Sequence, residues 1–511
     1  MATYLTFDIG TTALKTALID GDGRMLAVHS AEYTARTPRP GWAEMKPDAY
    51  WEAAVAGAHS VLSRASVDPA ELTAIGFSSQ GESFIPLDAG GEPLCDAIVW
   101  VDNRAQDLAE RWEAEWLSRD RYRRICGYPW VPGELTLFKI AWLAEHAPGA
   151  HAAAKFLWLP DYLIYRLTGE AATDYNIAQM GGLYDIRAAA WSPELLDAAG
   201  ITPEQLPPVH PPGTAVGEVH AAAAKELGIP AGVIVCVGAN DQLAGAIGAG
   251  NVRPGLVTET TGTALAVVAT TEALLDDDRM FVGVHAVRGA HYGMPFGTTS
   301  AIVLTWFRDL CEPGAGYDEF LADVAEVPPG CEGLTVLPHF SGTACPTFNP
   351  SARGAIVGLT LGHTRAHIAR AIMESCACLL RELLEPILAH DIEVTSIRSL
   401  GGAARSDLWL QMKADMLGIP VERPACPDAA SLGAAMLAAT GTGQFESTAE
   451  AADTWYSADR VFAPNPALSE AYQEVYARYL DVYERLYYVQ RYVGLSSPTP
   501  LISSPTPNES G

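Results

Sequence analysis

The sequence predicts an α/β protein divided into two domains of related fold, and three observations lead to this prediction. Strand-like apolar runs alternate with segments of helical spacing, which is the pattern of the α/β class. The chain opens with a strand that runs into a short turn of glycine and threonine, and the same pattern begins again after Gly250. With 511 residues, 49% of them hydrophobic and 18% charged, the chain is long enough to build more than one core.

The first elements form a predicted antiparallel meander. Thr3–Ile9, Ala13–Asp20 and Arg24–Tyr33 have strand composition, and Gly21-Asp22-Gly23 predicts a tight turn between the last two. Apolar spacing then predicts a helix over Pro47–Ser63, strands over Ala74–Ser78 and Ala97–Val101, and a charged helix over Arg104–Trp116.

The middle of the chain changes character at the proline-rich connection Pro203–Gly213. A strand over Val233–Val237 follows and runs into Asn240-Asp241. Later patterns predict a helix over His367–His390, a strand over Ser396–Leu400, a Gly401-Gly402 turn and a helix that extends through Met416. We predict domains over residues 1–249 and 250–490, with a ligand in the cleft between them. The repeated Ser-Ser-Pro-Thr-Pro motif predicts a disordered tail over residues 491–511.

Charge and composition exclude several classes of partner. A formal net charge of −28 argues against nucleic acid and against an anionic membrane surface, since both require a basic face. No apolar run approaches the ~20 residues that span a bilayer, and no leader pattern precedes the first strand. Nine cysteines without a repeated C-x-x-C spacing indicate reduced thiols. We therefore expect a cytoplasmic protein whose partner is a small molecule or another protein.

The two glycine turns predict a phosphate site. Asp8 ends the first strand and is followed by Gly10-Thr11-Thr12, with Lys15 close behind; Gly262-Thr263 repeats the device in mid-chain. Turn amides and hydroxyls of this kind bind phosphate oxygens, and a carboxylate beside them can hold Mg²⁺. A plain hairpin turn with an acidic edge residue is the alternative for the first copy alone. The second turn, at Gly262-Thr263, favours a site in which both turns bind the same phosphate chain from opposite sides.

A second carboxylate follows another strand. Asp241 precedes the small residues Ala244, Gly245, Ala246 and Gly248, which allow close helix packing. At a strand end facing a cleft it would serve as general base for a hydroxyl, or else as N-cap of the following helix.

The motifs of other nucleotide-binding and catalytic sites are absent or incomplete. No lysine follows a glycine, so a P-loop is excluded, and the His-Arg-Asp and Asp-Phe-Gly motifs of protein kinases are missing. A nucleophile elbow at Gly76–Gln80 lacks its last glycine. His363 and His367 favour capping or packing over metal binding.

Taken together, these motifs resemble the FGGY family of carbohydrate kinases over nearly the whole chain. The second signature of that family is matched from Gly354–Leu359 through a spacer to His367–Glu374. The first is matched by Thr136–His146, although Glu134 departs from its pattern. The resemblance implies two ribonuclease-H-like, actin-type domains that close over a sugar and ATP.

The resemblance also implies roles for individual residues. It places Asp8 on Mg²⁺ and makes Asp241 the base that takes the proton of the sugar hydroxyl. The implied cofactor-binding residues are Gly10, Thr11, Thr12 and Lys15 on the phosphates, Gly262 and Thr263 on the terminal phosphate, and Gly401, Gly402 and Ser406 on the adenosine.

The predicted sugar site combines features of two kinase groups. Trp100-Val101-Asp102-Asn103-Arg104 matches the family stretch W-x-D-x-R, in which the indole would pack on a carbon chain while Asp102 and Arg104 bind hydroxyls or organise the site; a surface Asp–Arg pair is the plainer alternative. Segments around Gly133, Arg166 and Phe462 most resemble xylulokinases. After the glutamine, however, xylulokinases usually carry a Met-His pair where this chain has Gly81-Glu82. Glycerol kinases carry Gln-Arg-Glu there and Asp-Gln at the base, which Glu82 and Asp241-Gln242 fit.

Three hypotheses follow. The first is ATP- and Mg²⁺-dependent phosphorylation of a small sugar, D-xylulose to D-xylulose 5-phosphate. The second is a kinase for glycerol or another polyol or ketose, and the third is a nonenzymatic actin-like ATP-binding module. Substrate ligands are expected among Gln80, Glu82, Trp100, Asp102, Arg104, Asp241 and Gln242. The family allows a homodimer.

Overall fold

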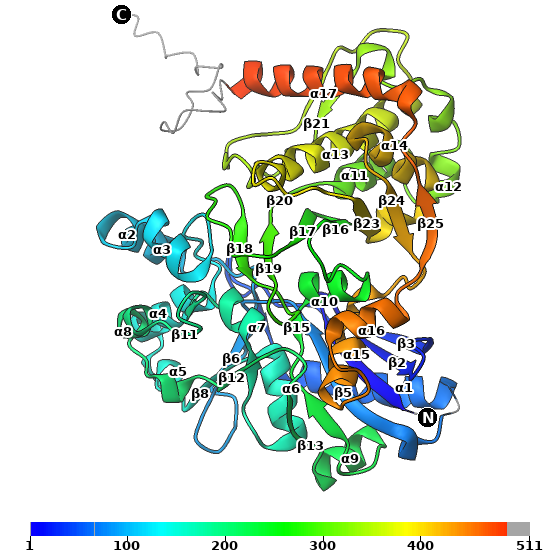
Figure 1. Ribbon diagram of the computed structural model, residues 1–511. Helices are drawn as coiled ribbons and strands as arrows, with labels where there is room; N and C mark the ends of the chain where they lie inside the picture. Colours follow the sequence, from blue (N-terminus) through cyan, green and yellow to red (C-terminus); the bar gives the residue numbers. More distant parts are fainter. Residues whose placement is uncertain (1, 66, 488–511) are drawn as a thin grey trace, which may run out of the picture. The chain divides into compact units, whose positions relative to one another are not determined.

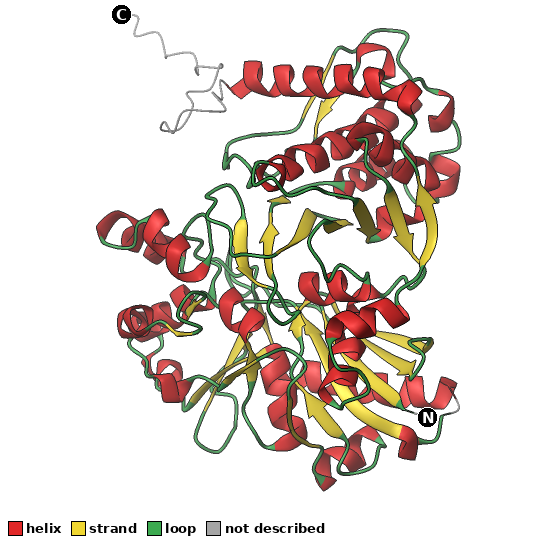
Figure 2. Ribbon diagram, in the orientation of Figure 1, coloured by secondary structure: helices red, strands yellow, loops and turns green. Residues whose placement is uncertain are grey.

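The computed structural model describes residues 2–65 and 67–487, and the predicted tail over residues 491–511 lies outside them. The chain forms two compact units. The first takes the chain up to Thr258 together with Val268–Gly293 and Pro424–Ala458, and the second takes Glu259–Val267, Met294–Arg423 and the chain from Asp459. The predicted limits follow chain order, whereas the late segment Pro424–Ala458 belongs to the first unit. The alternation of helices and strands confirms the α/β class (Figure 2).

The first unit is built on a mixed sheet with the order β13-β14-β5-β1-β2-β3, with β15 also pairing with β5. Figure 1 labels β2, β3, β5, β13 and β15 of this sheet. Its strands are β1 (Thr3–Ile9), β2 (Ala13–Asp20), β3 (Met25–Glu32), β5 (Leu72–Ser79), β13 (Ala215–Glu218), β14 (Ile234–Cys236) and β15 (Ala239–Asn240). The predicted meander is present as the antiparallel pairs β1–β2 and β2–β3, and β5 lies parallel to β1, β14 and β15. Parallel neighbours end at the same edge of the sheet, which is where ligand sites form in α/β folds.

Helices cover both faces of this sheet. On one face, Gly57 of α1 (Pro47–Ala65) lies so close to Thr16 of β2 that a Cβ atom would meet its hydroxyl at 2.0 Å. On the other face, Gly76 of β5 lies against Ala434 of α15 (Ala429–Gly441). Glycine therefore sets the spacing on both sides. The segment of α15 also explains why Pro424–Ala458 joins this unit, because it buries the second face of β5.

The remaining elements of the first unit surround this layer. A smaller sheet has the order β4-β7-β6-β8, and β9 pairs with β12 and β10 with β11. These strands are β4 (Glu44–Met45), β6 (Phe84–Leu87), β7 (Ala97–Ile98), β8 (Lys155–Trp158), β9 (Thr173–Asp174), β10 (Tyr184–Asp185), β11 (Ala190–Trp191) and β12 (Val209–His210). The other helices are α2 (Gln106–Glu115), α3 (Arg119–Cys126), α4 (Thr136–His146), α5 (Pro148–His151), α6 (Leu159–Thr168), α7 (Tyr175–Met180), α8 (Pro193–Ala199), α9 (Ala221–Leu227), α10 (Asp241–Gly248) and α16 (Thr448–Trp455).

A second mixed sheet has the order β18-β19-β17-β16-β23-β24-β25, with β20 on β17, and its strands β16 and β17 contribute residues to both units. The strands are β16 (Leu256–Thr261), β17 (Leu265–Thr271), β18 (Phe281–Val284), β19 (His291–Met294), β20 (Phe296–Gly297), β23 (Ser396–Leu400), β24 (Val421–Pro424) and β25 (Ala458–Phe462). The predicted restart of the chain after Gly250 is thus the pair of strands β16 and β17.

The core of the second unit lies among its helices. Buried apolar side chains come from α11 (Ala301–Cys311), α13 (Arg365–Leu388), α14 (Asp407–Leu417) and α17 (Pro466–Tyr487). The short elements α12 (Tyr317–Phe320), β21 (Thr335–Leu337) and β22 (Ala355–Val357) complete this unit. Within residues 2–65 and 67–487, no helix has the length and apolar character needed to cross a membrane.

Candidate active site

Three neighbouring strands of the first unit deliver polar side chains to one edge of the sheet. In register, Asp8 of β1 lies beside Ser78 of β5, and Ser79 lies beside Asn240 of β15. Ser78 Oγ donates to Asp8 Oδ1 at 2.7 Å. Because these strands are parallel, their carboxyl ends bring Asp8 and Asp241 to the same edge, as the sequence predicts for a site at strand ends.

Asp241 begins α10 and does not act as its N-cap. Asn240 has that role, since its side-chain oxygen accepts from Gln242 N at 3.1 Å. Burial, and to a lesser degree the Asp8 carboxylate, raise the pKa of Asp241 to about 7, although hydrogen bonds from Gln242 oppose the rise. A carboxyl group with this pKa can exchange a proton near neutral pH, as a general base must.

Asp8 is partly open to solvent, and its pKa is also raised. Burial is the main cause; the Ser78 hydrogen bond and Lys15 lower it, and Asp428 raises it. Lys15 Nζ donates to Asp428 Oδ1 at 2.7 Å, so the predicted phosphate ligand is paired with a carboxylate of the late segment. Among the residues that the structure describes, no cluster of at least three His, Cys, Asp or Glu side chains could hold a metal. Mg²⁺ is commonly held by one or two carboxylates together with phosphate oxygens and water, and Asp8 is a carboxylate at the strand-end edge that is partly open to solvent.

The predicted phosphate turn at Gly10 is held by two of the predicted substrate ligands, Gln80 and Trp100. Gly10 N donates to Ala13 O at 3.0 Å, and Gly10 O accepts from Gln80 Nε2 at 3.0 Å. Trp100 Nε1 donates to Thr11 Oγ1 at 2.8 Å. Gln80 thus holds the turn, and the indole of Trp100 connects the W-x-D-x-R stretch with the hydroxyl of Thr11.

Glu82 projects from a strained turn. Its φ of 60° lies in the left-handed region, and Thr136 Oγ1 donates to its carbonyl oxygen at 2.9 Å. Burial raises the pKa of Glu82, Asp241 raises it further, and Lys139 and Tyr128 lower it. A strained non-glycine residue with a partly exposed carboxylate is typical of a ligand-binding position.

Lys139 of α4 is a buried cation behind this loop. Its Nζ donates to the carbonyl oxygens of Val99 at 2.9 Å and Trp100 at 3.1 Å. Burial lowers its pKa, and the carboxylates of Asp102 and Glu82 raise it. The lysine therefore fixes the backbone that carries the Trp100 indole.

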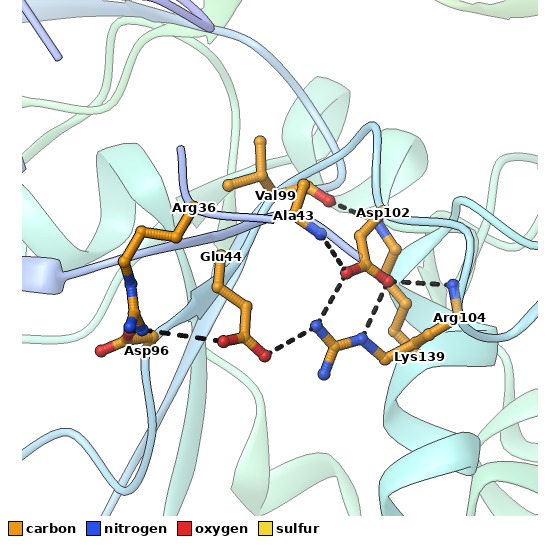
Figure 3. A network of polar contacts seen from close by, with 8 residues as sticks. All are labelled: Arg36, Ala43, Glu44, Asp96, Val99, Asp102, Arg104 and Lys139. Carbon is orange, nitrogen blue, oxygen red and sulfur yellow. Dashed lines mark hydrogen bonds and ion pairs between the residues drawn. The ribbon is translucent and has the colours of Figure 1, made fainter. Parts of the chain in front are cut away.

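Asp102 and Arg104 face one another. Figure 3 shows the Asp102 carboxylate accepting from Ala43 N at 2.6 Å and from Arg104, whose guanidinium also reaches Glu44 Oε1 at 2.9 Å. Asp102 is fully buried, and Arg104 stacks on Trp42 with 3.8 Å between Cζ and the ring centroid. Of the two predicted roles, this geometry favours organising the site over contacting hydroxyls.

The predicted nucleotide turns lie in the second unit. Gly262 N donates to Ala264 O at 2.9 Å, and a side chain at Gly262 would meet open space. Gly401 has a φ of 80°, and a Cβ atom there would meet Thr261 O at 2.8 Å. The turn of Gly401 and Gly402 therefore passes directly beside the strand that leads to Gly262 and Thr263. Ser406 Oγ caps α14 by accepting from Trp409 N at 3.3 Å.

The other motifs have structural roles. His363 Nδ1 accepts from Thr360 N at 2.9 Å, and His367 belongs to the capping box of α13. Gly76, at the start of the failed nucleophile elbow, packs on α15. Sequence reasoning missed Tyr128 and Lys139 as neighbours of Glu82, although Lys139 lies within the first signature.

Comparison with known proteins identifies the class. The N-terminal domain of the FGGY family of carbohydrate kinases matches residues 3–248, and its C-terminal domain matches residues 257–442. The chain therefore belongs to the FGGY family of carbohydrate kinases, as the sequence motifs predict. Members of this family take the phosphoryl group from ATP.

Individual relatives include two kinds of kinase. The chain is 35% identical to the glycerol kinase of Methylibium petroleiphilum, over 91% of this chain and 95% of that one. It is 28% identical to the xylulose kinase of Bacillus subtilis, over 94% and 97%. The crystal structure of xylulose kinase from Rhodospirillum rubrum superposes with a TM-score of 0.86 at 30% identity, over 95% and 99%. These matches confirm the predicted two-domain, actin-like fold class.

Proposed function

We propose that this protein transfers the γ-phosphoryl group of ATP to a terminal hydroxyl of a small ketose, converting D-xylulose to D-xylulose 5-phosphate. Asp241 carries the proposal, because it is a partly exposed carboxylate at the strand-end edge with a pKa near neutrality. In the proposed step the substrate O–H proton passes to Asp241, an O–P bond forms to the substrate, and the P–O bond to ADP breaks. Mg²⁺ held at Asp8 would neutralise charge on the phosphates when bound.

The segments around Gly133, Arg166 and Phe462, which most resemble xylulokinases, support a ketose, and the turn of Gly81 and Glu82 departs from the glycerol kinase pattern. Glycerol kinases carry an arginine at the position of Gly81, but a Cβ atom there would come within 2.6 Å of Met180 Cβ. Gly81 is buried, so a long side chain would have to displace that neighbour. The position leaves Glu82, rather than a cation, as the charged group of the turn.

Glycerol or another polyol is the second candidate. Glu82 and the Asp241-Gln242 pair fit glycerol kinases, and the glycerol kinase of M. petroleiphilum is among the most similar relatives. Membership of a kinase family leaves the third hypothesis, a nonenzymatic ATP-binding module, without support. We further propose a cytoplasmic location, with which the free thiols of the described residues are consistent, and a homodimer remains a prediction from the family.

Coupled ADP release with ATP and Mg²⁺ tests this proposal. The panel contains D-xylulose, L-xylulose, the ribuloses, glycerol, erythritol and gluconate. We expect kcat/KM for D-xylulose to exceed that for glycerol by about a hundredfold or more, because buried polar groups discriminate strongly between hydroxyl patterns. The reverse order would transfer the assignment to the polyol. The variant Asp241→Asn should lose at least about a hundredfold in kcat with the best substrate.

A further inference from the structure

A charged cluster lies in the core of the second unit. Its members are the side chains of Glu259, Thr261, Ser399 and Lys413, and each of these residues is fully buried. Lys413 Nζ lies 2.5 Å from Glu259 Oε1, and both side chains are closed to solvent. Lysine and glutamate are seldom fully buried, so this pair needs a reason.

The hydrogen-bonding groups of the cluster match one another. Lys413 has three N–H donors, and these reach Glu259 Oε1, Thr261 Oγ1 at 2.9 Å and Ser399 Oγ at 3.4 Å. Thr261 in turn donates to Glu259 Oε2 at 2.5 Å, and Ser399 donates to Glu259 Oε1. The ammonium group therefore sits between two hydroxyls that are both oriented by the same carboxylate.

Each hydroxyl belongs to a strand that leads directly into a predicted nucleotide turn. Thr261 ends β16 and precedes Gly262-Thr263, while Ser399 lies in β23 just before Gly401-Gly402. The two strands are neighbours in the sheet. Lys413 comes from α14, the helix that follows the second turn. Its side chain therefore connects the two strands at the points where they lead into the turns.

Stability alone does not account for the pair. Removing two charges from water costs several kcal/mol per ion, and apolar side chains of similar volume often serve a core equally well. A bonded ion network does fix geometry, because its donors and acceptors are satisfied in one arrangement only. The turns that it joins must hold their backbone groups in place for a nucleotide.

We propose that Lys413 is a positioning residue for the nucleotide: paired with Glu259, it locks the Gly262-Thr263 turn and the Gly401-Gly402 turn into one fixed spacing. This inference rests on the proposed function, because it takes these turns as the nucleotide site. Lys413 is closed to solvent and acts through Thr261 and Ser399.

Isothermal titration calorimetry with ADP tests the inference on the full chain. The double variant Glu259→Leu/Lys413→Met removes both charges and keeps side chains of similar size, so it should fold, with a melting temperature lowered by the loss of partners for the Thr261 and Ser399 hydroxyls. We expect its Kd for ADP to rise about tenfold, as loss of supporting contacts commonly causes, with KM for the sugar unchanged. A folded double variant that binds ADP like the wild type would overturn the inference and leave the proposed function standing.

Ser399→Ala is a second, milder variant in case the double variant does not fold. It removes one hydroxyl of the cluster, and Ser396→Ala is its matched control on the same strand, because Ser396 Oγ donates to Glu422 Oε1 at 2.6 Å instead. ADP binding should weaken in Ser399→Ala and not in Ser396→Ala, and equal binding by both would count against the inference. Wild-type protein that neither binds ADP nor turns over any substrate would remove the proposed function and the inference together.

Discussion

As the proposed general base, Asp241 would give the reaction a defined pH dependence. Burial and the neighbouring Asp8 hold the pKa of Asp241 at about 7, and only its carboxylate form can accept the proton of the substrate. We expect log(kcat/KM) for the sugar to rise by about one per pH unit below pH 7 and to level off above it. A profile between about pH 5 and pH 9 checks this.

Asp174 supplies the control for that profile. Its pKa is also raised by burial to about 7, but it caps α7 instead of facing the strand-end edge. Asparagine is an equally good N-cap, so Asp174→Asn should fold and keep the inflection near pH 7. Loss of the inflection in Asp174→Asn would show that the pH dependence belongs to Asp174 and not to Asp241.

The same carboxyl group of Asp241 lowers the stability of the free enzyme at alkaline pH. Its folded pKa of about 7 lies above the ordinary 3.8, so its favourable contribution is complete below pH 3.8 and is lost as the pH rises through 7. Asparagine cannot ionise, and Asp241→Asn should therefore raise the free energy of unfolding at pH 8 by up to about 4 kcal/mol. Urea unfolding at pH 8 and pH 5.5 measures this, and an equal gain at both values would contradict a titrating cause.

At the scale of elements, α4 and the turn after β7 act as a unit through Lys139. Lys139→Met removes the ammonium group that holds the carbonyl oxygens of Val99 and Trp100, so the indole loses its fixed position. We expect KM for the sugar to rise about tenfold with little change in KM for ATP, measured by coupled ADP release.

Lys155 offers a matched lysine outside the site. Its Nζ donates to two backbone carbonyl oxygens, those of Glu204 at 2.6 Å and Leu206 at 3.2 Å. Lys155→Met should leave both KM values unchanged. Equal effects of the two variants would mean that Lys139 stabilises the first unit without positioning Trp100.

Helices α10 and α15 pack so closely that only glycine fits at their contact. A Cβ atom at Gly433 would meet Ala244 O at 1.9 Å, so Gly433→Ala should force the helices apart and lower the free energy of unfolding by about 2 kcal/mol or more. Gly149 lies in α5, where an added Cβ atom would have no neighbour within 4 Å, and Gly149→Ala is the control. Thermal unfolding of both variants measures this loss, and a Gly433→Ala variant as stable as the wild type would contradict the close packing.

These elements show what the sequence could predict. The limits of β1, β2 and β23 match their predicted ranges because strand patterns are local. The small residues after Asp241 correctly predicted close packing, but not the partner helix, which follows almost two hundred positions later in the chain. No local pattern encodes such a partner, because it depends on contacts between distant segments.

Sequence patterns likewise predicted some residues of the candidate site and missed others. Strand-end positions led to Asp8 and Asp241, which the sheet register brings to one edge. The buried pair of Glu259 and Lys413 gave no signal, since the two residues stand 154 positions apart. Burial also decided the case of Asp102, whose charge alone could not distinguish a hydroxyl ligand from an internal ion pair.

At the scale of the whole molecule, the excess of acidic residues should make stability depend on salt. A formal net charge of −28 produces self-repulsion that dissolved ions screen. We expect the melting temperature to rise by about 2–4 °C between 20 and 300 mM NaCl at pH 8, a change of about 1 kcal/mol. KCl at the same concentrations should raise the melting temperature equally. A lower melting temperature at high concentrations of both salts would show that attractive ion pairs outweigh the repulsion.

The membership of Pro424–Ala458 in the first unit has a consequence for synthesis on the ribosome. The helix that covers one face of β5 emerges only after more than four hundred residues have been translated. Until then, the nascent first unit exposes an apolar sheet face, and chains released early would keep it exposed. Completion of the first unit therefore has to wait until residues 424–458 have been translated, and truncated products should be substrates for chaperones and proteases.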